Sequence, residues 1–392
     1  MKDHSYRTAV RKRRVSYIRS LDRIPQLSNT ERNALKEVVS EYPFWVNDYY
    51  LGLIDWNNPN DPIRRLVVPD VSELGSWGAL DASNENAVTV ARGVQHKYTS
   101  TVLLLSTQNC GGFCRYCFRK RLFMEDNDEV HSDVLEGIRY IKEHPEVDNV
   151  LVTGGDPMVL STPAIEKMLK SLRRIRHLKI IRLGSKMPAF NPYRFINDPE
   201  LIEVLKKYNH PDRRIYFMCH FDHPNELTGP CREAIRLIQS TGAICLNQNP
   251  IIRGISDSPE VMRRLWNELS YMGIQQYYVF QSRPTRGNKP YTVPITEAYF
   301  NIEEAKGTCS GLSKRIRYVM SHSSGKVEIV GVDDNRIYLK YHRAKRQADN
   351  HRFLICHRDD NAHWLDQLKP VDGYRNKYYR RDLVLPAKTD IN

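Results

Sequence analysis

Short apolar runs alternate with helix-like stretches through the middle of this sequence, and that alternation restricts the fold more than any other feature. Six β-branched-rich runs predict strands at residues 101–106, 149–153, 178–183, 215–220, 243–252 and 276–281. Between them, apolar residues at three- and four-residue spacing predict helices at residues 133–143, 164–174, 198–207, 230–240 and 259–271. Strands that alternate with helices form a parallel sheet with right-handed crossovers. We therefore predict an α/β protein with a partial (β/α)6 barrel rather than a full eight-fold one.

The two flanks of this alternation have different patterns. Residues 1–99 are predicted to be mainly helical, with Ser28 and Glu31 forming a capping box for a helix at residues 29–40. Residues 286–392 contain a predicted hairpin, with strands at 327–332 and 336–341 joined by an Asp-Asp-Asn turn. We expect both extensions to close a catalytic barrel at residues 100–285.

Composition restricts the location and partners of the chain. The chain has no run of about 18 apolar residues, which a membrane span requires. Its basic N-terminus lacks the apolar run and cleavage site of a secretory signal, so we expect a cytoplasmic protein without a membrane partner. The net charge of +13 is concentrated at residues 11–14, 343–352 and 377–381. Nucleic-acid binding would use such charge, but we favour a solvated basic surface and no nucleic-acid partner.

Three cysteines follow the first predicted strand with the spacing CxxxCxxC: Cys110, Cys114 and Cys117. Cysteines in a long chain without a signal favour metal or redox chemistry over disulfides. Three thiolates at this spacing can bind three irons of a cubane cluster and leave the fourth iron open. Zinc or a redox pair is the alternative, but zinc sites usually take four ligands, often as two CxxC pairs that are not evident here. We therefore predict a [4Fe–4S] cluster on these cysteines.

The cysteine spacing resembles that of the radical S-adenosylmethionine (radical SAM) superfamily. The resemblance implies a TIM-like partial barrel of radical SAM type. It also implies that S-adenosylmethionine binds the open iron and is cleaved to a 5′-deoxyadenosyl radical. Gly154, Gly155, Asp156 and Pro157 end the second predicted strand and resemble the superfamily motif that binds the methionine amino group. An ordinary turn is the alternative interpretation of this motif.

Further segments resemble the lysine 2,3-aminomutase family, at residues 51–65, 95–98, 110–123, 220–226, 247–248 and 253–254. This resemblance extends to roughly residue 330. It implies an isomerase that moves the α-amino group of a free amino acid to the β-carbon through a pyridoxal 5′-phosphate aldimine. It also implies a one-electron donor such as flavodoxin or ferredoxin, and a homo-oligomer.

The family resemblance assigns cofactor roles to individual residues. Lys326 occupies the place of the lysine that carries pyridoxal phosphate, with Lys314 as the alternative. Lys97 matches a family arginine near the cofactor phosphate, whereas Thr101 stands where a second arginine would be. Gln248 matches a residue that contacts S-adenosylmethionine, and a buried strand glutamine is the alternative interpretation.

The residues expected at the substrate differ from those of lysine-specific members, which hold the ε-ammonium with two aspartates. Arg119 matches the residue that binds the substrate α-carboxylate, but Arg283 stands at the first aspartate and Ser321 near the second. An arginine in the pocket repels an ammonium and binds a carboxylate, so we favour a glutamate-like substrate. The alternative for Arg283 is that it faces the solvent. The alternative substrates are aspartate, a neutral amino acid or L-lysine, including β-lysine supply for elongation factor P. The alternative enzyme class is a radical SAM enzyme that modifies RNA.

Some family members hold a structural zinc through cysteines that this chain lacks. Ser258 stands at one of those positions, and the tail offers a single cysteine. We therefore expect no zinc. The remaining cysteines are expected to be buried or structural: Cys219, Cys231, Cys245, Cys309 and Cys356.

Overall fold

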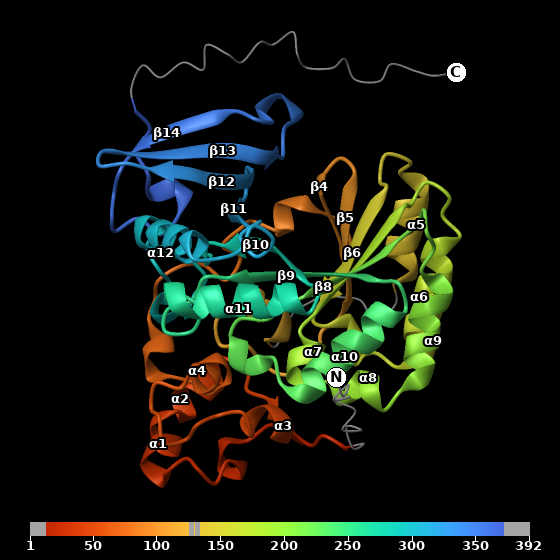
Figure 1. The fold of residues 1–392 in the computed structure, drawn as a ribbon, viewed down its shortest axis with the longest axis horizontal. Coiled ribbons are helices and arrows are strands. Elements are labelled where there is room, and N and C mark those ends of the chain that lie inside the picture. Colours follow the sequence, from red (N-terminus) through yellow and green to blue (C-terminus); the bar gives the residue numbers. More distant parts are fainter. Residues whose placement is uncertain (1–12, 125–128, 130–133, 372–392) are drawn as a thin grey trace, which may run out of the picture.

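A 12-stranded sheet forms the framework of the computed structural model, which describes residues 13–124, 129 and 134–371 (Figure 1). The strand order is β14-β13-β12-β11-β10-β9-β8-β7-β6-β5-β4-β3. Strands β5 to β11 run parallel, and the strands at both edges run antiparallel to their neighbours. The prediction of an α/β fold with a partial barrel is confirmed.

The parallel part of the sheet contains each predicted strand and one more. Its strands are β5 (Thr101–Thr107), β6 (Asn149–Gly154), β7 (Ile180–Ser185), β8 (Ile215–Cys219), β9 (Ile244–Pro250), β10 (Gln275–Phe280) and β11 (Arg317–His322). The sequence prediction missed β11 because its apolar run is short and has polar residues at both ends. The alternation therefore continues for one unit beyond the predicted six.

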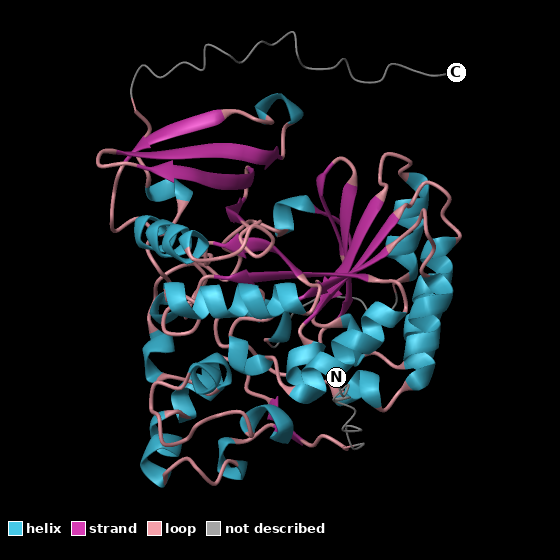
Figure 2. Cartoon of the chain, in the orientation of Figure 1, coloured by secondary structure: helices cyan, strands magenta, loops and turns pink. Residues whose placement is uncertain are grey.

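Helices cover the outer face of this sheet (Figure 2). They are α5 (Leu135–Glu143), α6 (Thr162–Arg173), α9 (Pro199–Tyr208), α10 (Gly229–Ser240), α11 (Pro259–Tyr271) and α12 (Ile295–Gly307). The first residue of the helix predicted at 133–143 lies outside the described residues. In α6 the side chains of Ile165, Met168 and Leu172 are buried at helical spacing in the core shared with the strands. None of the helices in the described ranges combines the length and apolar character that a membrane crossing requires.

The N-terminal flank is less helical than predicted. Its helices are α1 (Asn29–Ala34), α2 (Lys36–Glu41), α3 (Asp48–Leu51) and α4 (Pro62–Val67). The capping box of Ser28 and Glu31 is confirmed, but the single helix predicted at 29–40 breaks at Leu35. The break lets α2 bury Val38 although α1 buries no residue. Four strands were not predicted here: β1 (Tyr17–Ile18), β2 (Val46–Asn47), β3 (Thr89–Ala91) and β4 (Val94–Tyr98).

The C-terminal flank contains the predicted hairpin as β12 (Gly325–Val332) and β13 (Arg336–Ala344). The side chain of Asp333 accepts hydrogen bonds from the amides of Asn335 and Arg336 and stabilises the turn. A further strand, β14 (Phe353–His357), pairs with β13. Because β12 also pairs with β11, the hairpin continues the barrel sheet and adds its side chains to the barrel interior. Two short helices, α7 (Met187–Phe190) and α8 (Tyr193–Ile196), follow β7.

Candidate active site

One cavity of about 370 Å³ lies among the loops that follow the carboxyl ends of the parallel strands. Parallel α/β barrels place their chemistry at this end. The wall of the cavity contains these residues singled out in the sequence: Lys97, Thr101, Cys110, Cys114, Cys117, Arg119, Gly154, Gly155, Asp156, Gln248, Arg283, Ser321 and Lys326. Lys314, the alternative cofactor lysine, is exposed and is not part of this wall.

The N-terminal extension holds the cysteine loop in place. The indole nitrogen of Trp45 donates to the carbonyl of Cys110 at 3.0 Å. The side-chain amide of Asn47 donates to the carbonyls of Gly111 and Phe190. At Gly111 a Cβ would lie 2.5 Å from the sulfur of Met187, so a larger residue would have to displace that side chain. The extension therefore fixes the loop by contacts that the local sequence does not reveal.

A fully buried ion pair also fixes the loop. Arg115 lies between Cys114 and Cys117 in the sequence. It donates three hydrogen bonds to the carboxylate of Glu73, the shortest at 2.7 Å. Both side chains are inaccessible to solvent. Tyr291 donates to the same carboxylate at 3.0 Å, and the Arg115 amide donates to Leu66. Because both charges are paired and hydrogen-bonded, their burial is compatible with a stable fold.

The three thiols face the cavity and fit a cluster. Cys110, Cys114 and Cys117 are free, and burial raises the pKa of each thiol. Thiolates at such a place need a compensating positive charge, which iron supplies. Within the described ranges, no three His, Cys, Asp or Glu side chains are grouped closely enough to hold one metal ion. A cubane cluster does not require the three thiols to meet at one metal ion, because each thiolate binds a different iron.

The glycine turn after β6 binds the cysteine loop directly. The amide of Gly155 donates to Thr107 at 2.6 Å, and a Cβ at Gly155 would lie 2.2 Å from the carbonyl oxygen of Asn109. Gly154 has a φ of +110°, a conformation that favours glycine. The carboxylate of Asp156 accepts hydrogen bonds from the amide of Met158 and from three donors that follow β7. Burial raises the pKa of Asp156 to about 6.

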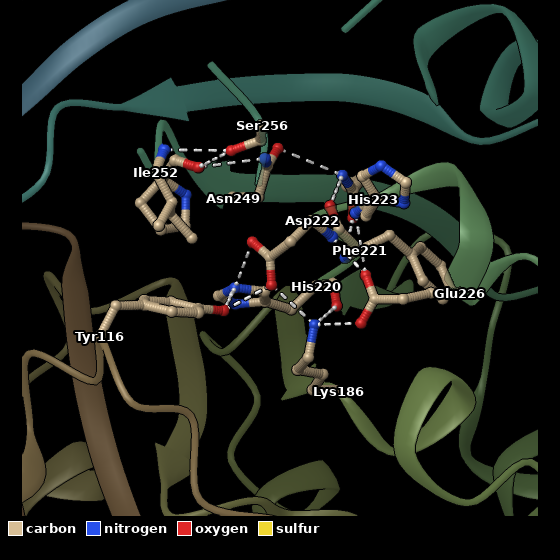
Figure 3. A network of polar contacts seen from close by, with 12 residues as sticks. Tyr116, Lys186, His220, Phe221, Asp222, His223, Glu226, Asn249, Ile252 and Ser256 are labelled. Atoms are coloured by element: carbon tan, nitrogen blue, oxygen red, sulfur yellow. Dashed lines mark hydrogen bonds and ion pairs between the residues drawn. The ribbon is translucent and has the colours of Figure 1, made fainter. Parts of the chain in front are cut away.

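A buried polar network lies beside the cysteine loop (Figure 3). The ammonium of Lys186 lies 2.7 Å from Asp222 and 2.6 Å from Glu226. The hydroxyl of Tyr116 contacts His220 at 2.9 Å and donates to Asp222. Burial alone would raise the pKa of Asp222, but Lys186 and His220 lower it below its usual range. The network connects the cysteine loop to the loops that follow β7 and β8.

Lys326 extends from β12 into the cavity. Its ammonium lies 4.1 Å from the ring centroid of Tyr278 and 5.2 Å from that of Phe280. Burial lowers the pKa of Lys326 to about 7, and the nearby cations, with Arg182 and Arg343 first, contribute to this shift. An amine with this pKa is substantially neutral at pH 7, and a neutral amine can attack a carbonyl. This is the behaviour required of a lysine that forms a Schiff base.

The predicted substrate arginines share one buried carboxylate that the sequence prediction missed. Glu85 accepts from Arg119 and from Arg283, each at 3.2 Å, and from Arg121 at 2.8 Å. The guanidinium of Arg283 also lies 3.7 Å from the ring centroid of Phe118. The alternative of a solvent-facing Arg283 is therefore wrong, because its side chain is only 16% exposed. Burial would raise the pKa of Glu85, but the three arginines hold it well below its usual range.

Comparison with known proteins identifies the family. The Radical SAM superfamily model matches residues 104–243. A provisionally named L-lysine 2,3-aminomutase of Aquifex aeolicus is 49% identical over 90% of this chain and 95% of its own length. The L-lysine 2,3-aminomutase of Clostridium subterminale is 33% identical over 76% of this chain and 71% of its own. The glutamate 2,3-aminomutase of Clostridioides difficile is 32% identical over 76% of this chain and 70% of its own length.

This chain belongs to the lysine 2,3-aminomutase family of radical SAM enzymes. It is therefore an isomerase, and the family resemblance drawn from its motifs is confirmed. The cofactors of the family are a [4Fe–4S] cluster, S-adenosylmethionine and pyridoxal phosphate. The buried thiols and the lysine of low pKa in one cavity fit this cofactor set.

Three cationic residues of the aminomutase cavity were not identified from the sequence: Arg182, Lys186 and Arg343. Arg343 was assigned to a solvated basic surface, but it lies in the cavity wall with Arg182. Arg346, from the same basic stretch, has a side chain that is 78% exposed, as expected of a surface residue. The remaining cysteines are buried, as predicted, whereas the absence of zinc stays a prediction.

Proposed function

We propose that this chain is a 2,3-aminomutase for an amino acid with an anionic side chain, with glutamate as the leading substrate. The carboxylates of the cavity wall carry this proposal. Among the described residues of that wall the carboxylates are Glu85 and Asp156. Glu85 is bound by three arginines, and Asp156 accepts four hydrogen bonds. Neither carboxylate is available to a lysine ε-ammonium.

The charge of the pocket favours the same substrate class. Arg119 and Arg283 face the cavity together with Lys97, Arg182 and Arg343. Lys186 also lies in the wall, but it pairs with Asp222 and Glu226. An ammonium brought among these groups would be repelled in a medium of low dielectric constant, whereas a carboxylate would be attracted. The preference follows from the local charge around the substrate and not from the overall charge of the protein.

The spacing of the two arginines suits a molecule with two carboxylates. One nitrogen of Arg119 and one of Arg283 each lie 3.2 Å from the same oxygen of Glu85. The nitrogen of Arg119 and the nitrogen of Arg283 are therefore separated by at most twice 3.2 Å, so one small ligand can contact both. We assign Arg119 to the α-carboxylate and Arg283 to the side-chain carboxylate. Guanidinium groups bind carboxylates with a defined geometry and so orient the β-carbon.

The residues of the chain have separate tasks in this reaction. Cys110, Cys114 and Cys117 would hold three irons of the cluster, and Lys326 would hold pyridoxal phosphate. When bound, these cofactors supply the hydrogen-abstracting radical and activate the migrating amino group. We assign Gln248 and the turn of Gly154, Gly155 and Asp156 to the binding of S-adenosylmethionine. The enclosing barrel excludes water and other hydrogen donors, and an external donor such as flavodoxin or ferredoxin supplies the electron.

L-lysine is the second candidate substrate, because two of the relatives named above are lysine 2,3-aminomutases by name. The two candidates make opposite predictions for Arg283. If the pocket binds lysine, removal of this cation should increase activity on lysine. If the pocket binds glutamate, removal of this cation should decrease activity on glutamate.

The deciding experiment measures the product. The protein is reconstituted anaerobically with iron, sulfide, pyridoxal phosphate and S-adenosylmethionine, then reduced and given glutamate, aspartate or lysine. Mass spectrometry detects β-amino acids. We expect β-glutamate from the wild type and a decrease of about 10- to 100-fold in kcat/KM for Arg283→Gln, which removes a charge-assisted contact. Arg236→Gln is the matched control, since Arg236 lies on the outer helix α10 and pairs with Glu233.

The outcomes separate the candidates. β-Lysine as the main product, with a gain in activity for Arg283→Gln, would overturn the glutamate assignment and keep the family. Conversion of aspartate labelled with carbon-13 at its α-carboxylate into aspartate labelled at the side-chain carboxylate would keep the anionic class and shorten the substrate, because a 2,3-amino shift on aspartate returns aspartate. Equal activity of Arg283→Gln and Arg236→Gln on glutamate would contradict the role of Arg283.

A further inference from the structure

Three cations around Lys326 form no ion pair in the described part of the chain, although the more distant charge of Glu85 acts on one of them, Lys97. Arg343 donates to the hydroxyls of Thr101 at 3.0 Å and Ser100 at 2.9 Å. Arg182 donates to the side-chain oxygen of Asn149 at 2.8 Å. Lys97 donates to the carbonyl of His322. All three line the cavity that contains Lys326, so positive charge is concentrated on one side of it.

This arrangement favours a bound anion. The three side chains are partly shielded from water, and proteins normally neutralise such charges with a partner or a bound ligand. The pKa of Lys326 reflects this excess of positive charge in part, because burial and the neighbouring cations lower it to about 7. The other arginines of the cavity have a different arrangement, because Arg119 and Arg283 share Glu85. The positive charge that no carboxylate of the chain neutralises therefore lies beside Lys326, and a ligand group with two negative charges would be bound there.

The side chain of Arg343 is held in position for such a group. Its guanidinium lies 4.5 Å from the ring centroid of Tyr98, and two hydroxyls fix the two terminal nitrogens. A guanidinium has five N–H donors, so three remain for a ligand. In the register of β12 and β13, Arg343 lies directly opposite Lys326, and such pairs share one face of a sheet. An anion bound by Arg343 would therefore be part of a ligand whose other end reaches the amine of Lys326.

We propose that Arg343, together with Arg182 and Lys97, binds the 5′-phosphate of the pyridoxal cofactor that Lys326 carries. The proposal concerns the cofactor and is independent of which amino acid is the substrate. Phosphate monoesters carry close to two negative charges at neutral pH and are bound well by arginine forks. Thr101 would then act as the residue that positions Arg343 from strand β5. Arg343 is the cation that the C-terminal hairpin adds to this subsite, whereas Arg182 lies on β7 and Lys97 on β4.

Cofactor binding tests the proposal without any turnover. Full-length protein freed of pyridoxal phosphate is titrated with pyridoxal 5′-phosphate or with pyridoxal, which lacks the phosphate. Absorbance follows the lysine-bound cofactor, and borohydride reduction with mass spectrometry locates it on Lys326. We expect Arg343→Thr to weaken pyridoxal phosphate binding roughly tenfold to a hundredfold and to change pyridoxal binding much less, since Arg343 affects pyridoxal only through the pKa of Lys326. Arg346→Thr, at an exposed position after β13, should change neither.

Two further measurements keep the test decisive. The double variant Thr101→Arg with Arg343→Thr returns a guanidinium to the same place from β5, so we expect it to recover most of the lost affinity. Inorganic phosphate should compete with pyridoxal phosphate in the wild type and less in Arg343→Thr. An equal loss of pyridoxal and pyridoxal phosphate binding in Arg343→Thr would indicate a purely structural role and overturn the proposal. Unchanged pyridoxal phosphate affinity would also overturn it.

Discussion

The carboxylate of Glu85 accepts a hydrogen bond from Arg283 at 3.2 Å, although 198 positions separate the two residues in the sequence. Arg119 and Arg121 bind the same carboxylate, which is almost fully buried. Because three cations surround one buried anion, the loss of any one of these side chains would change the charge balance for the others. This group connects the N-terminal flank, the loop after the cluster cysteines and the end of β10.

Removal of the Glu85 charge should destabilise the fold. We expect Glu85→Gln to lower the free energy of unfolding by about 3 kcal/mol at pH 7, because it leaves buried arginines without their anion. Chemical denaturation followed by fluorescence measures this change. Glu166→Gln is the control, since Glu166 is part of a surface ion pair with Lys207 and should behave as the wild type.

The same carboxylate determines part of the acid sensitivity. Burial would raise the pKa of Glu85, but the arginines lower it well below its usual range. A group with a depressed folded pKa contributes stability above its unfolded pKa, which is about 4.3 for glutamate, and loses that contribution as pH falls toward the folded value. The stability difference between wild type and Glu85→Gln should therefore shrink below about pH 4. A constant difference from pH 7 to pH 3 would contradict this assignment.

The sequence was sufficient to predict the barrel and the cysteine loop because both depend on local patterns. β-Branched runs identify strands, and the spacing of Cys110, Cys114 and Cys117 within one short segment predicts three thiols on one loop, which the structure places in the cavity wall. Ion pairs such as that of Glu85 with Arg283 could not be predicted, because they depend on how distant segments meet.

The position of Arg343 shows how a small irregularity changes a site. The simplest pairing of the predicted hairpin would place residue 342 opposite Lys326. The structure pairs Val327 with Tyr341, as that simplest pairing requires, and a shift in register between Lys326 and Val327 then places Arg343 opposite Lys326. A shift of one residue turns a side chain to the other face of a strand. Nothing in the local sequence indicates this shift, so the arginine was assigned to the surface.

A methyl group at Gly155 should disrupt the cluster loop. The Cβ of Gly155→Ala would lie 2.2 Å from the carbonyl oxygen of Asn109, and two backbones would have to separate to accept it. We expect a protein that folds but binds iron poorly after reconstitution, measured by iron content and by absorbance in the visible range. Gly311→Ala is the matched control, because no atom lies within 4 Å of its added Cβ. Full iron content in Gly155→Ala would show that the loop tolerates the displacement.

The low pKa of Lys326 should appear in the rate at which the protein binds pyridoxal phosphate. Burial lowers this pKa to about 7, with Arg182 as the next contributor, and only the neutral amine attacks the cofactor aldehyde. The rate of covalent attachment should therefore rise with a midpoint near pH 7 and become constant above about pH 8. An ordinary lysine, with a pKa of about 10.4, would give a rate that still increases at pH 9.

Stopped-flow absorbance measures this profile, and variants assign it. Lys326→Ala should abolish attachment, whereas Lys314→Ala should retain it, because Lys314 is exposed outside the cavity. Arg182→Gln removes a neighbouring cation that helps to lower the pKa, so the midpoint should move upward. If the midpoint stayed near pH 7 in Arg182→Gln, burial would be the dominant cause of the low pKa. If Lys314→Ala abolished attachment, the cofactor would be carried by Lys314 and not by Lys326.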